Sequence, residues 1–101
     1  MKREEILIHT AEVKVRVMVL PPGDATTWHS HTEVTDHMVA LSGRILVSLR
    51  HPEETRELQP GERCQVAVGR VHRVANGSTA EPASYLLIQG VGRYDYQSEQ
   101  S

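Results

Sequence analysis

The feature that most constrains the fold is a series of short strand patterns separated by turns that contain glycine or proline. The clearest pattern, at 13–20, reads Val-Lys-Val-Arg-Val-Met-Val-Leu, with valine at every odd position. Because side chains alternate between the two faces of a strand, this period of two predicts a strand with one buried face. Pro21 and Pro22 end it, since proline cannot donate a hydrogen bond within a sheet.

Similar short patterns continue along the chain, and no amphipathic helix of ten or more residues interrupts them. We expect Ser42-Gly43 to turn the chain between two strands that pair as a hairpin. Many short strands between such turns favour an all-β sandwich or barrel. The further strands are predicted at 26–31, 36–41, 44–49, 63–68, 71–75 and 84–89.

Length and charge narrow the class of protein. A chain of 101 residues fits one domain, residues 1–101. The 11 Lys and Arg against 13 Asp and Glu give a net charge of −2, so we expect no binding to nucleic acid. No apolar run approaches the ~20 residues that span a bilayer, and the charged opening does not resemble a signal peptide. Cys64 is the one cysteine, so the chain cannot form an internal disulfide, and this favours a reducing, cytoplasmic location. Its thiol is expected to be buried and inert.

Six histidines form the main candidate for chemistry. His29 and His31 are two residues apart in a predicted strand, so their side chains share a face about 7 Å apart along the chain. The surrounding spacing reads G-x5-H-x-H-x4-D-x6-G from Gly23 to Gly43. A second segment, from Gly61 to Asn76, reads G-x5-A-x-G-x2-H-x3-N. Its histidine is His72.

These two segments resemble the two sequence motifs of the cupin family, and together they cover about half of the chain, 23–76. The ending, 89–96, is similar to that of small single-domain bacterial cupins. The resemblance implies a single-domain jelly-roll barrel in which His29, His31 and His72, with one carboxylate, hold a divalent metal. Asp36 stands where the family usually has glutamate, and Ala67 stands where it has proline. The polar tail, 97–101, is expected to be frayed.

The chemistry of this set suits several metals. Three neutral imidazoles and a carboxylate bind borderline divalent ions such as Zn, Fe, Mn, Ni or Cu. An aspartate ends about 1.5 Å short of a glutamate on ordinary bond lengths. Either the backbone moves inward or a water bridges the gap, and we therefore expect Asp36 to hold the metal weakly or through water. Glu33 and His37 are the neighbours that the spacing excludes from this role.

Three classes of function stay open from the sequence. The chain is a metal-dependent enzyme (a dioxygenase or an isomerase/lyase), a non-catalytic module for a small ligand or a metal, or an interaction protein with an empty site. The ligand would be a small oxygen-bearing molecule, which Arg44 and Arg73 are candidates to orient. We also expect a homodimer, because the apolar run at 6–8 could add a strand to a partner and because single-domain cupins are commonly dimeric.

Overall fold

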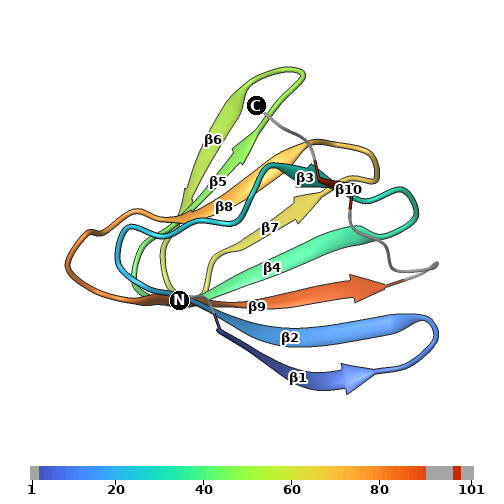
Figure 1. The fold of residues 1–101 in the computed structure, drawn as a ribbon, viewed down its shortest axis with the longest axis horizontal. Coiled ribbons are helices and arrows are strands. Elements are labelled where there is room, and N and C mark those ends of the chain that lie inside the picture. The colour runs from blue at the N-terminus through green and yellow to red at the C-terminus, as the bar shows by residue number, and fades with distance from the viewer. Residues whose placement is uncertain (1–2, 91–96, 99–101) are drawn as a thin grey trace.

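The computed structural model describes residues 3–90 and 97–98, and these form ten β-strands. Figure 1 shows them as two curved sheets that face each other. The strands are β1 (Arg3–His9), β2 (Val13–Leu20), β3 (His29–Ser30), β4 (Thr35–Ser42), β5 (Ile45–Leu49), β6 (Glu54–Leu58), β7 (Arg63–Val66), β8 (His72–Asn76), β9 (Ala83–Gly90) and β10 (Gln97–Ser98).

Each sheet has five strands, and every pairing is antiparallel. One sheet has the order β1-β2-β9-β4-β7 and the other the order β10-β3-β8-β5-β6. Strands that follow one another in the chain thus often lie in opposite sheets (Figure 1). This all-β arrangement confirms the predicted jelly-roll. Within the part of the chain that the structure describes there is no helix, and hence no candidate membrane-spanning helix.

The even-numbered residues of β2 point their side chains toward the interior of the barrel. Arg16 and Leu20 are buried, whereas the valines at 15, 17 and 19 are only partly covered on the outer face. The alternation thus correctly indicates a strand, but the valine face is the outer one. The inner face meets the core between the sheets. That core consists of Leu20, Met38, Ala40, Ile45, Val47, Leu49, Leu58, Cys64, Val66, Val74, Ala83, Tyr85 and Leu87.

The predicted hairpin at Ser42-Gly43 is wrong. The strand before it, β4, pairs with β7 and β9, and the strand after it, β5, pairs with β6 and β8 in the other sheet. At this crossing Gly43 has a φ of +74°, and a Cβ there would lie 2.6 Å from the carbonyl oxygen of Pro82. Only glycine fits this conformation and this close approach, so the Gly43 signal marks a crossing between sheets instead of a hairpin.

The first and last strands of the described residues lie at the edges of the two sheets. The run at 6–8 belongs to β1, which pairs with β2 of the same chain, and its side chains are about half exposed. The predicted strand at 26–31 is reduced to β3, and β6 was not predicted. In the tail that was expected to be frayed, Gln97–Ser98 pairs with β3, because that short strand offers its backbone to an antiparallel neighbour. Residues 99–101 lie outside the described residues.

Candidate metal centre

The four residues predicted as ligands come together inside the barrel. His29 begins β3, His31 follows that strand, Asp36 lies in β4 and His72 begins β8. All four are buried, and one potential ligand atom from each lies within 4.8 Å of the others. The structure therefore assembles from three strands and one connecting segment the group that the two motifs indicate.

Strand pairing explains why the histidines meet. His29 and His72 are directly opposite each other in the pairing of β3 with β8, and their ring centroids are 4.3 Å apart. The ring of His31 lies 5.1 Å from that of His29. Asp36 comes from the facing sheet, so the candidate site bridges the two sheets at one end of the barrel.

Hydrogen bonds to the backbone orient two of the imidazoles. The Nδ1 of His29 lies 2.7 Å from the carbonyl oxygen of Thr27, and the Nδ1 of His72 lies 2.9 Å from that of Arg70. A carbonyl oxygen can only accept, so each Nδ1 carries a proton, and the Nε2 of each ring is turned toward the site. This is the tautomer that a metal bound at Nε2 requires.

The lone pair of His72 faces a carboxylate. Its Nε2 lies 2.9 Å from Oδ2 of Asp36, and the Nε2 of His31 lies 3.3 Å from the same oxygen. With Nδ1 of His72 protonated, the short distance joins two acceptors, which repel unless a cation lies between them. A proton or a divalent ion meets that need, so the donor set fits the metal that the motifs imply.

Asp36 is charged in this setting. Burial alone would raise the pKa of its carboxyl group. When a proton lies between Oδ2 and the Nε2 atoms of His31 and His72, these hydrogen bonds and the one from Gln89 outweigh burial and hold the pKa well below its usual range. Although aspartate is shorter than glutamate, Oδ2 of Asp36 lies within hydrogen-bonding distance of two imidazoles. Of the two alternatives expected from the sequence, this distance favours a backbone that moves inward over a gap bridged by water. A direct bond of Asp36 to a metal stays a prediction.

His29 is held neutral. Burial lowers its pKa to about 4 against a hydrogen bond with the carbonyl oxygen of Thr27, and the neighbouring His72 and His31 lower the pKa further. A neutral imidazole is the form that coordinates a metal, so near pH 7 this ring does not have to lose a proton on binding.

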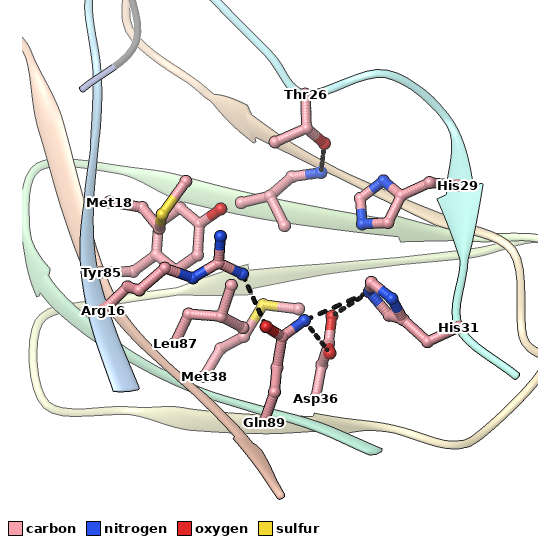
Figure 2. A pocket seen from close by; sticks show the side chains of 11 residues that line it. Arg16, Met18, Thr26, His29, His31, Asp36, Met38, Tyr85, Leu87 and Gln89 are labelled. Carbon is pink, nitrogen blue, oxygen red and sulfur yellow. Dashed lines mark hydrogen bonds and ion pairs between the residues drawn. The ribbon is translucent and has the colours of Figure 1, made fainter. Parts of the chain in front are cut away.

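A cavity of about 70 Å³ adjoins the four residues (Figure 2). It brings in two polar residues that the sequence analysis did not single out, Arg16 of β2 and Gln89 of β9. Both are buried, and an NH2 hydrogen of Arg16 is donated to Oε1 of Gln89 at 2.6 Å. The cavity lining is completed by Met18, Thr26, His29, His31, Asp36, Met38, Val74, Tyr85 and Leu87.

The arginines proposed to orient a ligand lie elsewhere. The guanidinium of Arg44 is exposed and bonds both carboxylate oxygens of Glu57 at 3.0 Å. Arg73 alternates away from His72 and stacks near the ring of Trp28, 5.2 Å from its centroid. As expected, His37 points to the other face of β4, where it is exposed, and Cys64 is a buried thiol within the core.

Comparison with known proteins agrees with this architecture of a jelly-roll barrel around a buried group of three histidines and one carboxylate. The model of the cupin domain family matches residues 16–89. The chain therefore belongs to the cupin family. Among curated proteins, no sequence matches it.

Three solved structures illustrate the likeness in fold. A conserved protein with a double-stranded β-helix domain from Klebsiella pneumoniae is 20% identical, with a TM-score of 0.84 over 98% of this chain and 85% of that one. The polyketide cyclase RemF from Streptomyces resistomycificus is 18% identical, with a TM-score of 0.83 over 99% and 72%. A recombinant oxalate oxidase in complex with glycolate is 17% identical, with a TM-score of 0.81 over 94% of this chain and 53% of that one.

Proposed function

We propose that this protein binds a divalent transition metal (Zn, Fe, Mn, Ni or Cu) through His29, His31, Asp36 and His72, and that it binds or converts a small oxygen-bearing molecule there. The observation that carries the proposal is the convergence of four buried donor groups within 4.8 Å. Backbone hydrogen bonds that turn two Nε2 atoms toward the site support it. When bound, such an ion supplies Lewis-acid or redox chemistry to a ligand oxygen.

The cavity favours a small, oxygen-bearing ligand. Its volume of about 70 Å³ is several times the roughly 10–15 Å³ that a cavity needs to hold one water molecule. The buried guanidinium of Arg16 lies in its wall and carries N–H donors of the kind that bind ligand oxygens, while Glu4 balances its charge at 2.9 Å. The oxalate oxidase bound to glycolate gives a parallel in a related fold, since glycolate is itself a small hydroxy acid.

A non-catalytic module for a small ligand or a metal is the second candidate, and the same cavity supports it. Among the described residues that line the cavity, the ionisable groups besides the candidate ligands are Arg16 and Tyr85. Neither accepts a proton from a substrate near neutral pH. An enzyme at this site, whether a dioxygenase or an isomerase/lyase, would therefore depend on the metal and its solvent for proton transfer.

Elemental analysis of protein purified without added metal tests the proposal. We expect close to one divalent transition metal per chain. Iron would favour oxygen chemistry, whereas zinc would favour the isomerase/lyase or the binding module. The proposal fails if the purified protein contains no such metal and takes up none when it is titrated with Zn²⁺, Fe²⁺, Mn²⁺, Ni²⁺ and Cu²⁺.

We also propose that the protein is a homodimer. The outer face of β2 presents the valines at 15, 17 and 19, and on the adjacent β1 Ile8 lies opposite Val15 and is 52% exposed. A second copy that covers this face would remove apolar surface from water. Light scattering at micromolar concentration should give twice the chain mass of 11.3 kDa. A monomer mass would contradict the proposal, and Ile8→Lys should shift a dimer toward monomer.

A further inference from the structure

A row of polar side chains crosses four neighbouring strands on the inner face of one sheet. Its members are Glu4 of β1, Arg16 of β2, Gln89 of β9 and Asp36 of β4, in the spatial order of the strands. Arg16 donates to Oε2 of Glu4 at 2.9 Å and to Oε1 of Gln89 at 2.6 Å. Gln89 in turn donates from Nε2 to Oδ1 of Asp36 at 2.8 Å, and the same nitrogen lies at the longer distance of 3.3 Å from Nε2 of His31. Figure 2 shows the inner three members.

The chemistry of its neighbours fixes the orientation of the Gln89 amide. Arginine can only donate and an ionised carboxylate can only accept, so Oε1 must face Arg16 and Nε2 must face Asp36. The opposite orientation would break both hydrogen bonds. Gln89 is also the residue directly opposite Asp36 in the pairing of β4 with β9, and both side chains are fully buried. The amide is therefore held by position and by partners on each side.

The two carboxylate oxygens of Asp36 thus have different surroundings. Oδ1 accepts the hydrogen bond from Gln89, and Oδ2 lies 2.9 Å and 3.3 Å from the Nε2 atoms of His72 and His31. Rotation of the carboxylate would exchange these oxygens and lose the bond from Gln89. Such a fixed carboxylate presents one oxygen to the site, and groups that orient a ligand in this way strengthen metal binding.

We propose that Gln89, held by Arg16, is a positioning residue that fixes the Asp36 carboxylate for metal binding. This inference rests on the proposed metal site and adds a determinant of its affinity that lies outside the two histidine motifs. Gln89 acts through Asp36 and is not itself a ligand. A merely structural role, in which Gln89 only satisfies buried polar groups, predicts the same stability loss but no link between Gln89 and Asp36 in metal affinity.

The first experiment compares two substitutions on β9. Gln89→Met keeps the approximate volume and removes the polar contacts of the amide with Arg16, Asp36 and His31. Leu86→Met is the matched control on the outer face of the same strand, away from the cavity. Zn²⁺ affinity is measured by competition with a chelator, and the visible spectrum of the Co²⁺ form reports coordination. We expect Gln89→Met to weaken Zn²⁺ binding about tenfold, as loss of a ligand-orienting hydrogen bond does. Leu86→Met should leave the affinity unchanged.

A double-mutant cycle with Asp36→Ala makes the test specific. If Gln89 acts through Asp36, adding Gln89→Met to Asp36→Ala should cause no further loss of Zn²⁺ affinity. An equal loss in both backgrounds overturns the inference, as does an unchanged affinity and Co²⁺ spectrum in Gln89→Met. If Gln89→Met does not fold, Arg16→Lys goes through the same cycle. Lysine keeps the positive charge and loses the forked geometry of the guanidinium. The inference fails if Arg16→Lys weakens Zn²⁺ binding equally in the wild-type and Asp36→Ala backgrounds. It also fails if Arg16→Lys leaves Zn²⁺ binding unchanged in both backgrounds.

The same titrations separate this inference from the proposed function. A wild-type chain that binds neither Zn²⁺ nor Co²⁺ overturns the metal site, and the positioning role falls with it. A wild-type chain that binds both ions, with a Gln89→Met variant that binds them equally well, overturns the positioning role and leaves the metal site intact.

Discussion

The two ends of the barrel interior are built from the same strands and differ sharply in chemistry. On β2 the inward side chains change from Leu20 to Arg16, and on β4 they change from Ala40 to Asp36. The strand between them, β9, follows the same course toward Gln89. One end is thus an apolar core, and the other is a buried polar site with three histidines.

This difference separates stability from function within one small fold. Burial of apolar side chains stabilises the folded state, whereas burial of charged groups costs free energy unless partners satisfy them. The polar end meets that cost with the short contacts around Asp36 and Gln89. A set of groups that is expensive to bury and unnecessary for the fold is typical of a functional site.

The largest expected effect on the fold is at the apolar end. Leu20 is fully buried, and Leu20→Ala should lower the free energy of unfolding by about 2–5 kcal/mol, from lost burial and the cavity left behind. Metal stoichiometry of the folded fraction should stay at the wild-type value. Denaturant unfolding and elemental analysis measure the two quantities. Leu41→Ala, at a side chain that is 45% exposed, is the control with little expected change.

At the polar end of the barrel interior, a substitution should affect metal binding and not the fold. His72→Ala should keep a folded barrel and lose most of its bound metal, with an affinity loss of at least roughly 100-fold, at or above the upper limit for an orienting hydrogen bond. Circular dichroism and metal analysis check the two parts. His37→Ala, an exposed histidine on β4, should retain the metal. Unchanged metal content in His72→Ala would refute the ligand assignment.

A smaller effect is expected from the carboxylate. Asp36→Ala should weaken metal binding less than His31→Ala does, because aspartate is one methylene shorter than the glutamate usual in the family and is expected to bind weakly or through water. The loss should still exceed that of Gln89→Met, since Gln89 acts through Asp36. Chelator competition ranks the three variants. Equal losses for Asp36→Ala and His31→Ala would show that the carboxylate is a full ligand.

The smallest expected effect is on the stability of the protein at acidic pH. The folded-state pKa of His29, about 4, lies below its ordinary 6.5, so the unfolded chain binds a proton in this range that the folded chain does not. The stability of metal-free protein should therefore fall as the pH drops from 6.5 to 4. A decrease in Tm of roughly 5–10 °C corresponds to about 1–2 kcal/mol for a domain of this size. His29→Gln should flatten this pH dependence, and His37→Gln should not.

The sequence predicts the candidate site better than it predicts the connections between strands. The resemblance of two segments to the cupin motifs implies His29, His31, Asp36 and His72, and all four meet in the structure. The crossing at Gly43 was misread as a hairpin, because a turn signal does not tell which sheet the next strand joins. That choice depends on contacts between distant segments, such as the close approach of Pro82.

Arg16 and Gln89 were missed for a related reason. Arg16 stands among valines in a strand whose alternation favours valine inside, and its partner Gln89 is 73 residues away. The bond between them exists only once β2 and β9 are paired. A charged residue among valines was the available signal, but Lys14 gives the same signal two residues earlier, so Arg16 could be singled out only with the strand order known.

The separation of the site residues along the chain has a consequence for folding kinetics. The contact between His72 and Asp36 spans 36 residues, and that between Gln89 and Asp36 spans 53. Such loops close late and slowly compared with local turns, because their closure entropy must be overcome before the contact forms. No early, locally ordered fragment therefore contains the complete set of donors. A metal ion added during refolding would report the time at which both sheets have closed.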